Sequence, residues 1–366
     1  MKNISIVGIG RLGLCFGLTL EKAGYNIVGC DISQDYVDSI NNKTIKSPES
    51  GVEELVKSSK YLKATTDLLE TINHSNVVFV VVATPSLPSG EYDHSQVDHL
   101  VTNLQKLGVQ ESTKHFIICC TTMPGYSDLV QERLKDYNYT VSYNPEFIAQ
   151  GTILRDQASP DMVLIGEGSK EAGDILEEIY VKHTQNNPNI CRMSRTEAEI
   201  CKISLNCFVT TKISFANMIG DMVVRSGGDP NVVLSAIGSD SRIGNKYLRY
   251  GYGYGGPCFP RDNRALAIYA NKINLPADIS IATDNINNKH LDFQVAEFEK
   301  NNDKHKEIVF NTVTYKPNTT IIEESQQLAF AVELARLGYD VKIKEHPETI
   351  KKVKEKYYNL FTYEEG

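Results

Sequence analysis

The sequence predicts an α/β protein with an N-terminal, doubly wound parallel sheet, a long central helix and a small α/β unit at the end. Three observations favour this fold class. Short apolar runs alternate with helical patterns over the first third, residues 196–225 form one unbroken helical pattern, and a new strand pattern follows the polar stretch at 301–306. Alternation of strand and helix is typical of parallel sheets covered by helices.

The predicted strands of the first part are continuous apolar runs, as expected for strands that are covered on both faces. They occupy residues 4–7, 26–30, 77–83, 115–120, 140–143 and 162–165. A helical pattern over residues 12–23 joins the first strand to the second. This order predicts a parallel sheet.

The helical pattern at 196–225 contains no proline and no glycine before Gly220. It is far longer than the mean helix of about 11–12 residues, and such a helix spans a core or bridges domains or subunits. Gly227 and Pro230 predict its end and the start of the next helix. Residues 238–264 form a Gly/Tyr-rich segment without regular periodicity, which is uncommon unless the segment is functional.

Beyond the polar stretch, an apolar strand pattern, a helical pattern and a second strand pattern predict the small α/β unit. They occupy residues 307–311, 326–337 and 340–344. We therefore expect three domains: a dinucleotide-binding domain at 1–194, a central helical domain at 195–300 and a C-terminal domain at 301–366.

The composition excludes several classes of protein. A net charge of -8 leaves no electrostatic footprint for nucleic acid or an anionic membrane. Eight cysteines form no CxxC pair and no zinc-spaced cluster, so we expect no metal and a reducing compartment. The longest apolar stretch, residues 77–83, is too short to span a bilayer, and no leader pattern opens the chain. We expect a cytoplasmic protein without membrane or nucleic-acid partners.

The turn Gly8-Ile9-Gly10-Arg11-Leu12-Gly13 lies where the first strand meets the first helix. Gly8 permits a tight turn, Gly10 lets the backbone approach a pyrophosphate, and Gly13 allows close packing of helix and strand. Asp31 ends the second strand, about 20 residues on, where an acidic side chain binds the adenosine ribose. These features indicate a Rossmann-type site. The carboxylate of Asp31 favours NAD over NADP, while FAD, which shares the pattern, stays open.

Cys258 differs from the other thiols because it lies in a Gly/Pro-rich loop beside Arg261, where a nearby cation would favour a reactive thiolate. Lys202 and Asn206 project from one face of the long helix and suit an oxyanion or a water. Glu146 follows a predicted strand at the sheet edge where ligands bind. Taken alone, Cys258 could also be an inert cysteine and Glu146 a surface carboxylate. The face that carries Lys202 and Asn206 could also be an ordinary solvated helix face.

A series of further strings follows the glycine turn in order. They are Val82-Ala83-Thr84-Pro85-Ser86, Thr121-Thr122-Met123-Pro124-Gly125, Asn144-Pro145-Glu146-Phe147, the string at 160–166, Ala198-Glu199 leading into Lys202 and Asn206, the string at 240–244, Gly255-Gly256-Pro257-Cys258-Phe259-Pro260-Arg261-Asp262 and the string at 315–319. Over residues 4–320 the sequence resembles the UDP-glucose/GDP-mannose dehydrogenase family.

The resemblance implies NAD-dependent oxidation of a nucleotide sugar to a uronic acid, by two hydride transfers through a thiohemiacetal and a thioester. UDP-glucose is the expected substrate. GDP-mannose and a UDP-N-acetylhexosamine are the alternative substrates. The implied catalytic residues are Cys258, Lys202, Asn206, Asp262, Thr122 and Glu146. The implied cofactor contacts are Gly8, Gly10, Leu12, Gly13, Asp31, Thr84, Pro85 and Thr122. The implied substrate contacts are Glu146, Phe147, Ile148, Lys202, Asn206, Arg242, Tyr247, Gly255 and Lys316. The long helix is expected to form a homodimer.

The sequence departs from the family pattern at several places. Gln150 stands where the family has a second glutamate, and Glu323 where it commonly has an arginine near the cofactor phosphates. Asn311 replaces a common glycine, and the C-terminal domain is expected to be abbreviated. These departures keep open a second interpretation, a catalytically impaired homologue that binds NAD or a sugar nucleotide.

Overall fold

The computed structural model describes residues 2–317 and 319–366, so that Asn318 of the string at 315–319 lies outside the described residues. The chain forms two compact units, Met1–Lys202 and Ile203–Gly366. The expected three-domain division stays a prediction.

The first unit is built on an eight-stranded sheet in the order β3-β2-β1-β4-β5-β6-β7-β8. Its strands are β1 (Asn3–Val7), β2 (Asn26–Cys30), β3 (Leu62–Thr65), β4 (Val77–Val80), β5 (Lys114–Ile118), β6 (Tyr139–Tyr143), β7 (Met162–Gly166) and β8 (Asn189–Met193). Strands β1 to β6 are parallel. The Rossmann-type α/β class is confirmed, with two strands, β3 and β8, beyond those predicted.

The last two strands run against the other six. β7 pairs antiparallel with β6 at Tyr143 and Gly166, and β8 is parallel to β7. The reason lies in the connection after β6, whose short helix α7 (Ile153–Ala158) packs on α1 (Arg11–Lys22). A parallel connection would carry the chain back to the end of the sheet where β6 began. This connection stays at the end where β6 finishes, so β7 runs antiparallel to β6.

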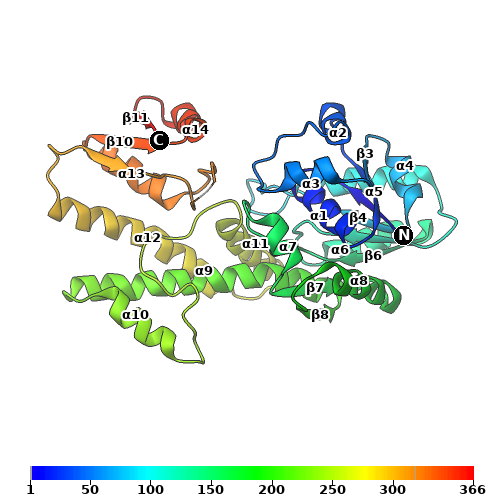
Figure 1. Ribbon diagram of the computed structural model, residues 1–366. Helices are drawn as coiled ribbons and strands as arrows, with labels where there is room; N and C mark the ends of the chain where they lie inside the picture. Colours follow the sequence, from blue (N-terminus) through cyan, green and yellow to red (C-terminus); the bar gives the residue numbers. More distant parts are fainter. Residues whose placement is uncertain (1, 318) are drawn as a thin grey trace. The chain divides into compact units, whose positions relative to one another are not determined.

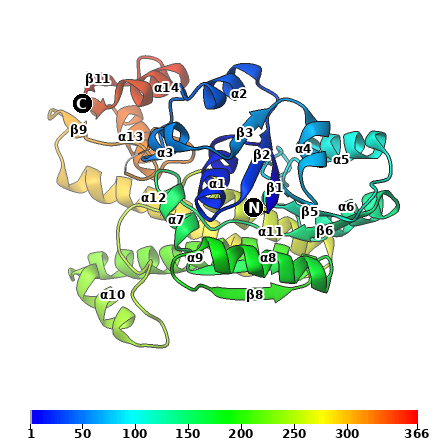
Figure 2. The same cartoon turned by 45° about the vertical axis from the view of Figure 1, so that its right-hand side comes forward.

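Helices cover both faces of the sheet (Figure 1, Figure 2). The remaining helices of this unit are α2 (Gln34–Asn41), α3 (Val52–Ser58), α4 (Leu68–His74), α5 (Ser95–Leu107), α6 (Tyr126–Leu134), the short 3₁₀ helix η1 (Lys135–Tyr137) and α8 (Lys170–His183). Successive strand residues enter opposite cores: Phe79 packs in the core around α1, while Val78 and Val80 pack in the core with α5 and α6. Continuous apolar strands are therefore buried on both sides.

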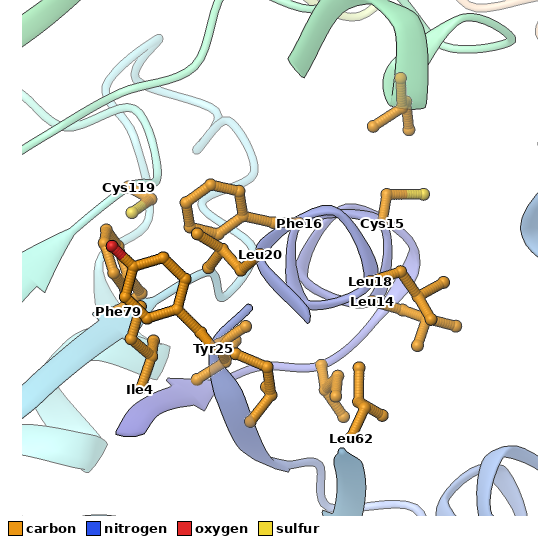
Figure 3. Close-up of a cluster of buried hydrophobic side chains, with 14 of the residues drawn as sticks. Ile4, Leu14, Cys15, Phe16, Leu18, Leu20, Tyr25, Leu62, Phe79 and Cys119 are labelled. Atoms are coloured by element: carbon orange, nitrogen blue, oxygen red, sulfur yellow. The ribbon is translucent and has the colours of Figure 1, made fainter. Parts of the chain in front are cut away.

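Phe16 anchors the core around α1. Its ring meets Phe79 edge-to-face with centroids 5.0 Å apart, and Figure 3 shows Leu14, Leu18 and Leu20 radiating from the same helix. Burial of each such side chain contributes about 1.5–3 kcal/mol. This packing fixes α1, and with it the glycine turn that precedes the helix.

Helix α9 (Arg195–Arg225) has almost the bounds predicted from the sequence. It ends before Gly227, whose φ of 76° only glycine adopts easily, and Asp229 then caps α10 (Pro230–Ser239). By length and composition α9 alone among the described helices could cross a membrane, but only by the test that long core helices of soluble proteins also pass. Asp221 within α9 accepts a hydrogen bond from Tyr250, as suits a helix packed in a protein.

The rest of the second unit joins helices to a small parallel sheet in the order β11-β10-β9. Its elements are α11 (Phe259–Lys272), α12 (Asp278–Asn301), β9 (Ile308–Phe310), α13 (Gln326–Arg336), β10 (Val341–Glu345), α14 (Pro347–Tyr357) and β11 (Thr362–Glu365). Phe298 of α12 packs on Phe330 of α13 with ring centroids 5.7 Å apart. Helix α12 thus shares one core with the sheet.

A buried carboxylate fixes the start of α9 on the first unit. Glu199 is fully buried and accepts hydrogen bonds from the Thr122 hydroxyl at 2.8 Å, the Gly125 amide at 2.6 Å, and both the amide and the hydroxyl of Ser127 at 2.8 and 2.6 Å. These donors belong to the loop between β5 and α6 and to the first turn of α6. One side chain therefore ties α9 to the carboxyl edge of the sheet.

We predict that Glu199→Ala destabilises the protein strongly, because it leaves several buried donors without an acceptor. If two of the four donors find no other acceptor, at about 1–3 kcal/mol each, the free energy of unfolding falls by roughly 2–6 kcal/mol. Urea unfolding followed by circular dichroism measures this loss. The control is Glu178→Ala, which removes an exposed pair with Lys2 and should cost about 1 kcal/mol or less. Equal losses in both variants would contradict the anchoring role.

Candidate active site

The glycine turn has the geometry that a dinucleotide site needs. Gly8 has a φ of 90°, and a Cβ there would lie 2.7 Å from the Val81 carbonyl oxygen. A Cβ on Gly13 would lie 2.2 Å from the carbonyl oxygen of Gly8, whereas a Cβ on Gly10 would meet nothing within 4 Å. Gly8 and Gly13 are thus required by the protein's own packing. Gly10 borders open space, as expected where a ligand approaches the backbone.

The amino end of α1 follows this turn and favours an anion. No acidic residue lies in its first turn, so the free amides and the helix dipole are not offset. Arg11 opens the helix, and its guanidinium donates a hydrogen bond to Gln150 Oε1 at 3.0 Å. Gln150, which replaces the expected glutamate, thus holds a cation beside the turn without neutralising it.

Asp31 follows β2 at the same edge of the sheet. One carboxylate oxygen accepts a hydrogen bond from the Ser33 amide at 3.1 Å. The next side chain, Ile32, is 101% exposed, as single apolar side chains on a protein surface often are.

Strand order places the loops after β1 and β4 next to each other, where α/β sheets bind ligands. Thr84 lies in the loop after β4 and is buried, with its hydroxyl donating to the Thr121 carbonyl oxygen at 2.8 Å. Pro85 accepts through its carbonyl a hydrogen bond from the Asp93 amide at 2.7 Å. Leu12, in the first turn of α1, packs against the core. The expected cofactor residues therefore lie at one edge of the sheet.

Glu146 follows β6 and is only partly exposed. Its Oε2 accepts a hydrogen bond from Gln157 Nε2 at 2.8 Å. Burial raises the pKa of Glu146 to about 7, while the Gln157 hydrogen bond and the charge of Lys202 oppose the shift. A carboxyl group that titrates near neutrality suits a general base.

Lys202, on α9, completes this group. Its ammonium donates to the Glu146 carbonyl oxygen at 2.6 Å and lies 4.2 Å from the centre of the Phe147 ring. The first unit therefore brings Thr122, Glu146, Phe147 and Lys202 to the carboxyl side of the sheet. Ile148 lines a pocket beside Glu146.

In the second unit, Cys258 is the N-cap residue of α11. The structure describes all eight cysteines of the chain, and among them Cys258 is the one whose side chain is exposed. The positive end of the helix dipole favours a thiolate there, while the carboxylate of Asp262 in the first turn opposes it. Asp262, in the first turn of α11, is 1% exposed and accepts a hydrogen bond from Asn206 Nδ2 at 2.7 Å. Arg261 lies 3.4 Å from its other oxygen. The structure thus brings Cys258, Asp262 and Asn206 into one region of this unit.

The loop before Cys258 is fixed by α12 and by the C-terminal segment. Asn287 exchanges two hydrogen bonds with the backbone of Tyr254, at 2.9 and 3.0 Å. A Cβ on Gly255 would lie 2.1 Å from the Glu324 carbonyl oxygen, and one on Gly256 would lie 2.4 Å from the Tyr315 ring. Both glycines are therefore required by close packing, which adds a structural role to the expected substrate contact of Gly255.

The other expected substrate residues lie in exposed or partly exposed parts of the second unit. Arg242 pairs with Asp240 at 2.7 Å, and Tyr247 is 52% exposed. The Lys316 ammonium lies 5.6 Å from the centre of the Tyr315 ring. Glu323 is exposed, and its carbonyl accepts a hydrogen bond from the Gly256 amide at 3.0 Å. Within the described residues, no group of His, Cys, Asp and Glu could hold a metal ion.

Comparison with known proteins places this geometry in a family. Residues 2–184 match the NAD binding domain of the UDP-glucose/GDP-mannose dehydrogenase family, and residues 196–289 match its central domain. The chain belongs to the UDP-glucose/GDP-mannose dehydrogenase family. Its first domain binds NAD, which excludes the FAD alternative, and the chain is an NAD-dependent oxidoreductase of the nucleotide-sugar dehydrogenase type.

Named relatives of the family include enzymes for two sugar nucleotides. The chain is 30% identical to a UDP-glucose 6-dehydrogenase of Bacillus subtilis, over 93% of this chain and 75% of that one. It is 29% identical to a GDP-mannose 6-dehydrogenase of Pseudomonas savastanoi, over 93% and 80%. A solved UDP-glucose dehydrogenase of Pyrobaculum islandicum matches with a TM-score of 0.89 and 27% identity, over 100% and 86%.

We predict that Gly10→Ala weakens NAD binding without lowering stability. The new Cβ meets no protein atom, but it enters the space through which a pyrophosphate would approach. The Kd for NAD should rise at least about tenfold, or about 1.4 kcal/mol, in calorimetric titration. Gly251→Ala is a matched control, because its Cβ also meets open space, and it should keep the native Kd. An unchanged Kd for Gly10→Ala would show that the ligand does not approach this backbone.

Proposed function

We propose that the protein oxidises the primary alcohol of a nucleotide sugar to the uronic acid in two steps. UDP-glucose is the expected substrate, and one cysteine is the nucleophile that holds the intermediate. The observation that carries this proposal is the position of Cys258, an exposed thiol at the amino end of α11. Bound NAD, one molecule for each oxidation, supplies the hydride acceptor. The residues of this chain supply the nucleophile, the oxyanion contacts and the water.

Cys258 acts on the aldehyde formed in the first oxidation. The thiolate adds to the carbonyl carbon to form a thiohemiacetal, which becomes a thioester when it loses a hydride and a proton. A thiolate suits both steps, because it is nucleophilic near neutral pH and leaves readily. Asn206 is placed by Asp262 and offers an amide donor to the developing oxyanion, and Lys202 offers a positive charge.

Thioester hydrolysis needs a water and a base. Glu146 accepts one proton from the attacking water, the hydroxyl adds to the carbonyl carbon, and the thiolate of Cys258 leaves. Thr122 supports this step. Its hydroxyl donates its proton to Glu199, so its oxygen can accept a hydrogen bond from the water. Gln150 cannot take a proton, so Glu146 carries the basic role alone in this proposal.

Turnover with a panel of sugar nucleotides tests the proposal. With UDP-glucose and NAD, we expect two NADH per sugar, and Cys258→Ser should reduce formation of the second NADH at least about a thousandfold. Cys191→Ser is the control, since that thiol is half-buried on β8, and turnover should stay native. Preference for GDP-mannose or a UDP-N-acetylhexosamine would change the substrate. No NADH with any donor, despite NAD binding, would establish the catalytically impaired alternative instead.

We also propose a homodimer through α9. Phe208, Phe215 and Met222 recur at seven-residue spacing along this helix and are 68%, 41% and 57% exposed. Leu205 adds to the same stripe at 38% exposure. An apolar stripe of this period is typical of helices that pair with another helix. The long helix offers a second copy of the chain a matching face.

Phe215→Glu should separate the subunits, because it places a charge in the centre of the stripe. We expect light scattering after size exclusion to give the mass of a dimer for the native protein and of a monomer for the variant. The control is Leu129→Glu, at a 64% exposed position on α6 outside the stripe, which should stay dimeric. A native monomer would rule out the dimer.

The setting proposed for this enzyme is the cytoplasm, without nucleic acid or membrane as a partner. The net charge of -8 supports this setting, because it repels polyanions. The exposed thiol of Cys258 also suits a reducing compartment, where a thiol stays reduced.

A further inference from the structure

A small pocket with a volume of about 20 Å³ lies behind Glu146, within the first unit. Its walls come from the segment after β6, from α1, from the last turns of α7 and α8, and from the start of β7 with the residues before it. Phe16 and Pro145 supply apolar wall, while Glu146, Gln157 and His183 supply polar groups. The chemistry proposed for Glu146 uses the carboxylate but leaves these neighbours unexplained.

Gln157 and His183 are buried polar side chains with unsatisfied atoms. They are 4% and 6% exposed. Gln157 donates through Nε2 to Glu146, but its Oε1 has no hydrogen-bond partner. Neither ring nitrogen of His183 has a partner in good hydrogen-bond geometry, although backbone groups of Thr19 and Gln157 lie close enough to the ring to raise its pKa. A buried polar atom without a partner costs about 1–3 kcal/mol, so three in one pocket point to a ligand that bonds with them.

The ligand that fits is water. Burial lowers the pKa of His183 to about 4, so its neutral ring offers one N–H donor and one bare acceptor nitrogen. Gln157 Oε1 offers an acceptor, and the pocket volume of about 20 Å³ exceeds the roughly 10–15 Å³ that one water needs. The aromatic ring of Phe16 meets the His183 ring edge-on at 5.6 Å and keeps the imidazole in place.

We propose that Gln157 is a positioning residue for Glu146, and that it works with a water bound between its Oε1 and the ring of His183. The proposal rests on the proposed function of Glu146 as the base. Gln157 fixes the carboxylate with one hydrogen bond, and the water holds the amide in the orientation that presents its donor to Glu146.

The same amide can serve both protonation states of the base. While Glu146 is ionised, Nε2 of Gln157 donates to it. Once Glu146 has taken a proton from the attacking water, a 180° turn of the amide lets Oε1 accept the new O–H. Nε2 then faces the water and His183, whose bare nitrogen completes the chain. No oxidant or further reactant is needed, because one proton moves and the thiolate leaves.

Several titratable groups surround Glu146 and belong in any account of its pH dependence. They are Lys202 on α9, Tyr180 and His183 on α8, Asp156 on α7, Cys15 on α1 and Cys119 after β5. Lys202 is the group whose charge lowers the pKa of Glu146, and Gln157 lowers it by hydrogen bonding. The Gln157 bond to ionised Glu146 is charge-assisted and stronger than the bond that the turned amide makes to the protonated form, so loss of Gln157 should raise the pKa.

Infrared difference spectra against pH test the proposal on the full chain without substrate. The carbonyl band of protonated Glu146 is assigned by its absence in Glu146→Gln. Its midpoint should lie near pH 7 in the native protein and shift upward by about one unit in Gln157→Leu, a tenfold change in proton affinity. Gln105→Leu removes a similar hydrogen bond, from Gln105 to the Arg133 carbonyl at 2.9 Å, and should leave the midpoint unchanged.

His183→Phe distinguishes a hydrated pocket from a dry one. If the water is present, the variant loses a water partner, the Glu146 midpoint moves upward and the protein unfolds at lower temperature. If the pocket is dry, the variant removes unsatisfied nitrogens, stability rises and the midpoint stays native, which would overturn the water. A native midpoint in Gln157→Leu would overturn the positioning role. Because these measurements need no turnover, failure of the proposed oxidation would be detected separately, by the absence of NADH.

Discussion

The fully buried carboxylate of Glu199 is the interaction on which the first unit's chemistry depends. It accepts hydrogen bonds from the loop and the helix turn that follow β5, and it belongs to α9. Lys202 lies three residues farther along the same helix, so the position of its ammonium near the Glu146 carbonyl follows from the anchor. A charged group that is buried with this many donors specifies one docking of the helix, because any other docking would leave donors and charge unpaired.

The geometry of the sheet determines which ligand contacts the backbone can make and which are left to side chains. Parallel strands end at one edge, and the helix that follows β1 points its free amides at that edge. An anionic cofactor can therefore be held largely by backbone, which explains how a chain of net charge -8 binds a pyrophosphate. The exposed thiol at the amino end of α11 uses the same property of helix termini for a different purpose, to favour a thiolate.

Local patterns predicted what depends on local physics. The apolar strands, the end of α9 near Gly227 and the glycine turn follow from burial on two faces and from backbone conformations that glycine alone adopts easily. The reversal of β7 was not predictable, because it depends on where α7 packs and not on the strand's own residues. Strands β3 and β8 were missed because they are short and partly polar, and α14 because its apolar residues are few.

In the candidate site, too, some residues could be predicted from the sequence and others could not. Resemblance assigned Cys258, Lys202, Asn206 and Asp262 to the candidate site, because α9 and the start of α11 carry them at the spacing of the family pattern. Gln157 and His183 could not be found from the sequence, because a glutamine and a histidine on separate helices carry no signal of their shared burial. The hydrogen bond from Gln157 lowers the pKa that burial raises at Glu146, the proposed base. A base must lose solvation to gain proton affinity, yet it must stay ionised until the water attacks. Burial supplies the first condition, and the hydrogen bond from Gln157 with the charge of Lys202 supplies the second.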